Sequence, residues 1–263
     1  MDNDKLFKDT IKKLNADPAT RIKEGYVIML DVLGFRDLIS RRFGFTFFKI
    51  WADIKQSLLD KKEGLEKKIK PLDIDVLCLS DTLVVCISMK TRNKIDPRIL
   101  LSLIPQLIDC FFWEQFTKRV FFRGAISYGK YQCDIVNNIA MGEAIEEAYD
   151  WHSLSEWIGV VLTPSALYAK EKYIIENPND TSICTILNDR FVEYPIPFKE
   201  SKIYNTNACV WFKVTKDIKK NQQLLAQVLL VFSEIKHLHS VAAKYSNTLE
   251  FIKTRLGLNQ TNS

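Results

Sequence analysis

The chain has 263 residues, of which 47% are hydrophobic and 26% are charged, and its formal net charge at pH 7 is +5. This composition is typical of a globular protein with a full core, and it excludes a disordered or fibrous chain. The charge is modest and its signs are mixed along the chain, so we expect no nucleic-acid partner.

The cysteines and the apolar segments indicate the cellular compartment of the protein. The six cysteines lie far apart and form no C-x-x-C pair, which fits buried free thiols better than a zinc site or a disulfide framework. The richest apolar window, residues 99–113, is interrupted by four polar or proline residues, so we expect no membrane-spanning helix. The start, MDNDKLFKD, has no apolar signal core. We therefore expect a cytoplasmic protein.

The first half of the chain alternates helical and strand patterns. Charged and apolar residues at helical spacing predict an N-terminal helix over residues 1–22. The chain then predicts a strand at 26–30, two helices broken near Gly44 within 36–66, and a two-stranded hairpin at 73–89. A long helix at 97–116, a strand at 120–131 and a short helix at 142–149 follow.

This order predicts an α+β fold of the ferredoxin-like type, βααββαβ, with an antiparallel sheet and helices on one face. Further strands are predicted at 159–162, 184–194 and 209–214, and further helices at 164–172 and 222–255. We divide the chain into an N-terminal helix (1–22), a core (23–165) and a C-terminal elaboration of the same domain (166–263).

Two carboxylates follow apolar strand patterns. In MLDVLGFRDL, residues 29–38, Asp31 ends a buried run, where an unpaired charge would cost several kcal/mol. Asp81 occupies the tip of the predicted hairpin, so the two carboxylates become neighbours if the strands pair. Such a pair suits Mg²⁺ or Mn²⁺ bound to a triphosphate, and the helix expected to start after Gly34 and Phe35 suits phosphate. Equally, both aspartates could cap turns.

The motifs resemble those of class III nucleotide cyclases. Asp31-Val-Leu-Gly-Phe35 resembles the F-x-D-I-x-G-F element, and Leu79-Ser-Asp-Thr82 resembles the hairpin that carries the second metal aspartate. Arg123-Gly-Ala-Ile-Ser-Tyr-Gly129 and Gly142-Glu-Ala-Ile-Glu-Glu-Ala148 resemble the next strand and helix. The likeness covers about residues 24–165.

The resemblance implies a complete reaction scheme. Two Mn²⁺ or Mg²⁺ ions bind at Asp31, Val32 and Asp81, and phosphate binds at Gly34 and Phe35. The ribose 3′-hydroxyl attacks the α-phosphate, pyrophosphate leaves, and the site lies between the two subunits of a homodimer.

The chain departs from the family at several positions. The transition-state Asn and Arg fall on Glu146 and Asp150, which cannot donate to a developing phosphoryl charge when ionised. Arg123 is the nearest catalytic replacement, although it could equally be an Arg at a strand end paired with a surface acid. The purine-reading positions fall on Leu77 and Ile139, which cannot hydrogen-bond a base edge and which we assign to the base pocket.

With these departures, the chain resembles the uridylate and cytidylate cyclases of bacterial Pycsar antiphage systems. That resemblance implies a pyrimidine cyclase, favouring UTP over CTP, that makes a second messenger for antiviral defence. The alternatives are a catalytically degenerate nucleotide-binding module and an ATP or GTP cyclase. A polymerase palm is disfavoured because the chain has no basic stripe, and a diguanylate cyclase because the chain has no G-G-[DE]-E-F turn.

Overall fold

The computed structural model describes residues 21–34, 43–90, 95–234 and 242–258. Most of the helix expected over residues 1–22, and the start of the segment expected at 36–66, lie outside these ranges. The described helices are α3 (Phe43–Lys68), η1 (Pro97–Leu103), α4 (Ile104–Thr117), α5 (Glu143–His152), α6 (Pro164–Glu176), α7 (Thr181–Arg190), η2 (Lys199–Ser201), α8 (Ile218–Ser233) and α9 (Ala242–Leu256).

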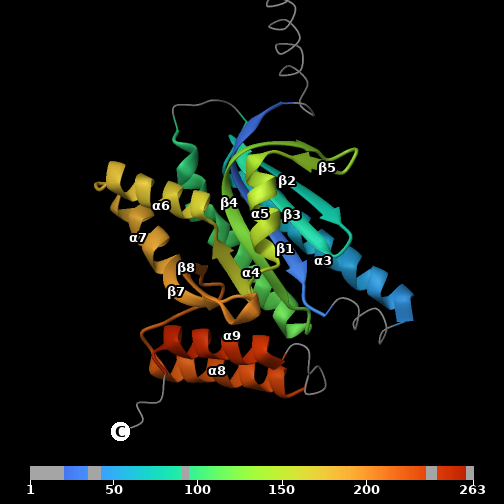
Figure 1. Cartoon of the computed structure of the whole chain (residues 1–263), viewed down its shortest axis with the longest axis vertical. Helices are drawn as coiled ribbons and strands as arrows, with labels where there is room; N and C mark the ends of the chain where they lie inside the picture. The colour runs from blue at the N-terminus through green and yellow to red at the C-terminus, as the bar shows by residue number, and fades with distance from the viewer. Residues whose placement is uncertain (1–20, 35–42, 91–94, 235–241, 259–263) are drawn as a thin grey trace, which may run out of the picture.

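An eight-stranded sheet runs through the molecule in the order β2-β3-β1-β4-β6-β8-β7, with β5 paired to β4 (Figure 1). Every pairing is antiparallel except that of β4 with β6. The strands are β1 (Lys23–Val32), β2 (Leu72–Leu79), β3 (Thr82–Met89), β4 (Phe122–Asp134), β5 (Ile139–Met141), β6 (Gly159–Leu162), β7 (Phe191–Pro197) and β8 (Ile203–Cys209). The α+β class and the antiparallel arrangement of the first four strands are confirmed.

The main core lies on one face of this sheet. Alternate residues of β1, Tyr26, Ile28 and Leu30, are at most 2% exposed and share a cluster with the apolar faces of α3 and α4. Successive side chains of a strand point to opposite faces, so this alternation assigns each β1 side chain to a layer. Asp31 therefore belongs to the other layer, together with Val27 and Met29.

That other face is covered by α5 and by the hairpin formed by β4 and β5. Leu77, Val84 and Met29 pack there with Tyr131 of β4 and Ala144 of α5 in a second, smaller core cluster. The prediction of helices on one face is wrong in this respect. The chain reaches this face because β4 turns back through β5, which pairs with the last three residues of β4 before α5 begins, and residue patterning does not reveal that pairing.

Four predicted elements differ in type or extent. The segment 184–190, predicted as strand, belongs to helix α7, whose N-cap Asp180 accepts a hydrogen bond from the Ile183 amide at 3.3 Å. The strand expected at 209–214 corresponds to β8, which ends at Cys209 and so overlaps the prediction by one residue. The helical segment expected at 222–255 consists of two helices, α8 and α9. In its described part, α3 is continuous across Gly44.

One helix in the described ranges, Pro97–Thr117, is long and apolar enough to cross a bilayer by length and composition. Its most apolar window has a mean hydropathy of 1.2 and is 61% buried inside the protein. Its buried residues, Leu101, Phe111 and Phe116 among them, belong to the main core cluster. Burial of this kind is that of a core helix.

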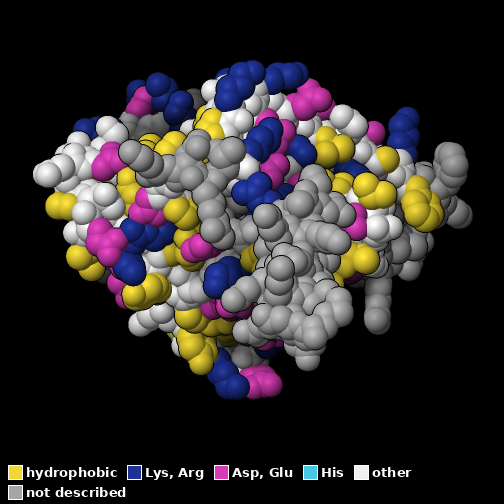
Figure 2. All heavy atoms as spheres, turned by 90° about the horizontal axis from the view of Figure 1, so that it is seen from above, with side chains coloured by type: hydrophobic (Ala, Val, Ile, Leu, Met, Phe, Trp, Pro, Cys, Tyr) yellow, Lys and Arg dark blue, Asp and Glu magenta, His cyan; other side chains and the backbone are white. Residues whose placement is uncertain are grey.

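The C-terminal helices α8 and α9 lie side by side beyond the β7–β8 end of the sheet (Figure 1). The Ile158 amide donates to Thr248 Oγ1 of α9 at 2.7 Å, and Phe251 of α9 packs on Trp157. On the face shown in Figure 2, Lys and Arg side chains are interspersed with Asp and Glu, with no continuous stripe of one sign.

Glu114 of α4 links α3 to α4, and its replacement gives a testable pH effect. Burial opposes ionisation, but hydrogen bonds from Lys118, Ser57 and Lys61 outweigh it and lower the pKa of Glu114 to about 2. The ordinary value is about 4.3, so ionised Glu114 stabilises the fold above that pH, and the stabilisation is lost as pH falls towards 2.

We expect Glu114→Gln to lower the free energy of unfolding at pH 7 by about 1 kcal/mol, a figure reduced for the exposure of the carboxylate. Urea unfolding from pH 7 to pH 3 should show wild type and variant converging below about pH 4.3. Glu63→Gln, which breaks an exposed pair with Lys67, is the control and should have little effect. A constant difference at all pH values would contradict this role of the Glu114 charge.

Candidate active site

The end of β1 brings together several residues that the sequence singles out. Asp31 lies directly opposite Thr82 of β3 on one side and Arg123 of β4 on the other. Directly opposed residues of antiparallel strands project from the same face, so these three side chains form a row across the sheet. Leu79 of β2 pairs with Thr82 and extends the row.

Asp81 sits in the tight turn between β2 and β3. The Val32 amide donates to the Asp81 carbonyl at 3.3 Å, which holds the turn against the end of β1. Ser80 before it has φ 59°, in the left-handed region that tight turns use. The structure thus brings Asp31, Val32 and Asp81 to one place, as the sequence predicts.

Asp31 has an ion-pair partner that the sequence analysis did not assign to it. Arg123 Nε donates to Asp31 Oδ2 at 3.0 Å, and the two side chains are 12% and 15% exposed. A guanidinium therefore compensates the Asp31 carboxylate, and the helix amides expected just after Gly34 lie outside the described residues. Within the described residues, the Asp81 carboxylate has no hydrogen-bond or ion-pair partner.

The carboxylates fit a divalent ion in donor type. The described part of the chain contains no cluster of three or more His, Cys, Asp or Glu side chains that could hold a metal by themselves. Magnesium bound with a nucleotide typically takes one or two protein carboxylates and fills its remaining positions with phosphate oxygens and water. Asp31 and Asp81 match that donor set, provided that Asp31 shares or releases its contact with Arg123.

Arg123 is fixed at its other end by residues that follow α5. Its Nη1 donates to the Ser155 carbonyl at 3.2 Å and lies 3.7 Å from Glu156 Oε1. Glu156 in turn pairs with Lys244 Nζ of α9 at 2.7 Å, and its carbonyl accepts from Asn247 at 2.7 Å. Charges of alternating sign thus run from Asp31 to Lys244, and we call them the ion-pair series.

The predicted phosphate-binding residues are described only in part. Gly34 has φ +71°, and no described residue lies within 4 Å of a Cβ built on it, so the chain makes a left-handed turn there. The Leu33 amide is already taken by the Phe121 carbonyl at 2.8 Å. Phe35 lies outside the described residues.

The residues assigned to the base pocket are not brought together. Leu77 is 1% exposed in the second core cluster, which does not include Ile139, and Ile139 is 47% exposed on β5. The Asn138 side chain donates to the Cys78 carbonyl at 2.9 Å, which ties the β4–β5 turn to β2. Leu77 is therefore a core residue here, and a base could reach it only if that hairpin moved.

Glu146 and Asp150, at the family's transition-state positions, are exposed on α5. The neighbouring acids have structural partners: Glu147 Oε1 accepts from the Ser165 amide at 3.1 Å, and Glu143 Oε1 accepts from the Lys130 amide at 3.0 Å. These bonds anchor α5 to β4 and α6.

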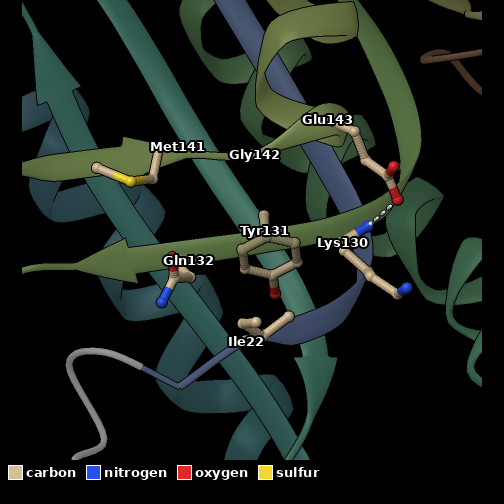
Figure 3. A pocket seen from close by; sticks show the side chains of 7 residues that line it. All are labelled: Ile22, Lys130, Tyr131, Gln132, Met141, Gly142 and Glu143. Carbon is tan, nitrogen blue, oxygen red and sulfur yellow. Dashed lines mark hydrogen bonds between the residues drawn. The ribbon is translucent and has the colours of Figure 1, made fainter. Parts of the chain in front are cut away.

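A shallow pocket of about 190 Å³ lies at the opposite end of β1. Its lining includes Ile22, Tyr131 and Met141, and Figure 3 shows Glu143 turned towards the Lys130 amide at its edge. Tyr131 lies opposite Lys23, the first residue of β1, whereas Asp31 is near the last. This pocket therefore does not belong to the candidate site.

Sequence reasoning identified Asp31, Asp81 and Arg123 but missed Lys244 and Asn247. These two residues lie on the terminal helix, and Asn247 is 91 positions from Glu156. A Lys and an Asn on an amphipathic helix carry no signal of such a contact, so only the folded chain reveals it.

Comparisons with known proteins give structural likenesses but no match in sequence. No protein-family model and no curated protein matches the chain. Among solved structures, it is similar to a protein described as the "crystal structure of the catalytic core of a rhodopsin-guanylyl cyclase with converted specificity in complex with ATPalphaS". The sequence identity is 12%, the match covers 72% of this chain and 98% of that chain, and the TM-score is 0.44. The fold class given above rests on the sheet and helices of this chain itself.

Proposed function

We propose that this chain is a nucleotide cyclase that converts a pyrimidine nucleoside triphosphate, UTP in preference to CTP, to its 3′,5′-cyclic monophosphate and pyrophosphate. The observation that carries the proposal is the position of Asp31 and Asp81 on adjacent strand ends, with the Arg123 guanidinium beside them. Two carboxylates and a cation at one place suit a metal-bound triphosphate.

Each residue has a distinct role in this proposal. Asp31 and Asp81, with Val32 between them in space, would hold Mn²⁺ or Mg²⁺, which supplies charge neutralisation at the phosphates. Arg123 donates N–H groups to phosphoryl oxygens as negative charge develops on them. Ser155 and Glu156 keep the guanidinium aimed at this point, so that its donors need little reorganisation.

The finer assignments follow from the resemblance and its departures. The structure does not bring Leu77 and Ile139 together, so the choice of base rests on the resemblance alone: the family's purine-reading positions carry no hydrogen-bonding side chain here, which favours a base recognised by size and by backbone contacts. As in the cyclases that the motifs resemble, we propose a homodimer in the cytoplasm whose product acts as a second messenger in antiviral defence.

The proposal is tested by incubating the purified protein with ATP, GTP, CTP and UTP separately, with Mn²⁺ or Mg²⁺, and identifying the products by mass. We expect cyclic UMP as the main product, less cyclic CMP, and pyrophosphate in equal amount. Production of cyclic AMP or cyclic GMP alone would overturn the pyrimidine assignment. No product from any triphosphate would overturn the cyclase assignment.

A second candidate is a nucleotide-binding module without turnover. Two observations favour it: Arg123 already neutralises Asp31, and exposed acids occupy the positions of the family's Asn and Arg. Saturable binding of a triphosphate, measured by calorimetry with no product in the same sample, would select this candidate.

A further inference from the structure

A cavity of about 420 Å³ lies where α7, the segment after β8 and the end of α9 meet, and none of its lining residues belongs to the candidate active site. Its volume is within the range of about 300–1,000 Å³ typical of small-molecule sites. Its lining consists of Asp189, Arg190, Val210, Phe212, Val214, Thr215, Lys216 and Arg255. The resemblance to cyclases assigns no role to these residues.

Three cations from three different segments line this cavity, namely Arg190, Lys216 and Arg255, against one carboxylate, Asp189. Arg190 is partly neutralised by Asp109 of α4, because its Nη2 donates to Asp109 Oδ2 at 2.5 Å and also to the Val210 carbonyl. Neither Lys216 nor Arg255 has an ion-pair partner among the described residues. Positive charge is therefore in excess at the lining.

The guanidinium groups also have unused donors. Arg190 Nε and Arg255 Nε are buried atoms without a hydrogen-bond partner in the described part of the protein. These two buried atoms have almost no surface, so they do not face the open cavity. Arg190 Nη1 and the two Nη groups of Arg255 are not among the buried atoms and have no hydrogen-bond partner among the described residues, so they remain as donors for a ligand.

The rest of the lining is apolar at its base. Val210 and Phe212 are 2% and 3% exposed and belong to the main core cluster, so they form a rigid floor. The Thr215 amide and hydroxyl are already engaged with Asn221. Recognition at this site therefore depends on the cations, and the floor accepts an apolar or ring-shaped part of a ligand.

We propose that this cavity binds a small phosphorylated molecule, with Arg190, Lys216 and Arg255 holding its phosphoryl group. Several cations converging from separate elements suit a phosphoryl group, which carries up to two negative charges and three acceptor oxygens. The planar forks of the two arginines can each donate in pairs to such oxygens. A single carboxylate would use only part of this donor set.

The test uses the full-length protein with EDTA present, so that no divalent ion supports phosphate binding at Asp31 and Asp81. Inorganic phosphate is titrated and followed by ³¹P NMR line width and by calorimetry, with sodium acetate at equal ionic strength as the comparison anion. We expect saturable phosphate binding that acetate does not displace.

Arg255→Gln and Lys216→Gln should each weaken phosphate binding about 10-fold, the effect of losing one charge-assisted contact. Neither side chain has an ion pair among the described residues, so both variants should fold, which circular dichroism checks. Lys253→Gln, with the same charge change on the same helix outside the lining, should bind within about two-fold of wild type.

Phosphate binding that is absent, unsaturable or equally displaced by acetate would overturn the proposal, as would unchanged binding in both Arg255→Gln and Lys216→Gln. None of these results depends on nucleotide turnover. The site can therefore stand or fall independently of the proposed cyclase activity.

Discussion

Replacing Asp81 with Asn should reduce cyclic nucleotide formation at least about 100-fold while the fold is retained, because each carboxylate contributes several kcal/mol of charge stabilisation at a metal-bound phosphate. Asp31→Asn should have an equal effect on activity. Product formation measured by mass at saturating Mn²⁺ checks both variants.

The two variants should differ in stability, which separates the functional role from the structural one. Asp81 has no side-chain partner in the described ranges, so Asp81→Asn should leave the melting temperature nearly unchanged. Asp31→Asn removes the carboxylate that accepts from Arg123 and should lower the melting temperature. Asp60→Asn, on the exposed face of α3 where Asp60 accepts from Gln56, is the control for activity. Near-normal turnover in either Asp31→Asn or Asp81→Asn would refute the paired-metal assignment.

Arg123→Ala should both strongly reduce activity and destabilise the protein. Removing this guanidinium leaves the carboxylates of Asp31 and Glu156 facing each other with one cation fewer, a change that costs about 3 kcal/mol for a largely buried pair. For a chain of this length that corresponds to a fall of about 6–12 °C in melting temperature. Turnover should fall about 10²–10³-fold, the effect of losing one preorganised donor.

Two comparisons identify what Arg123 contributes. Arg119→Ala removes an exposed arginine paired with Glu234 and should cost less than about 1 kcal/mol. A double-mutant cycle of Arg123→Ala with Glu156→Gln should give a coupling of about 0.5–3 kcal/mol if the pair acts as the geometry indicates. Arg123→Lys keeps the charge but loses the fork, so full activity in that variant would show that the fork is not required. Full activity in Arg123→Ala would show that Arg123 does not donate to the reaction.

The sequence predicts well what depends on local patterning. Three predicted strands, at 26–30, 73–79 and 83–89, correspond to β1, β2 and β3. The observed register pairs Asp31 with Thr82, the residue directly after Asp81. Strand period and turn chemistry are properties of neighbouring residues, so a single sequence reveals them.

What the sequence does not predict depends on distant contacts. Asp31 and Arg123 are 92 positions apart, and their pairing follows only from the strand register. Leu77 looks like an accessible pocket residue until the β4–β5 hairpin folds back over β2. The short run at 184–190 fits either a strand or a helix, and the Asp180 cap decides for α7.

The ion-pair series also sets the order in which the site can form during synthesis. Asp31 and Arg123 leave the ribosome early, whereas Lys244 and Asn247, which hold Glu156, lie close to the C-terminus. At about 5–20 residues per second, the final anchors arrive about 8–33 s after the two carboxylates. A nascent chain therefore carries Asp31 and Asp81 before Glu156 is anchored from α9, and the complete arrangement forms only after α9 has been synthesised.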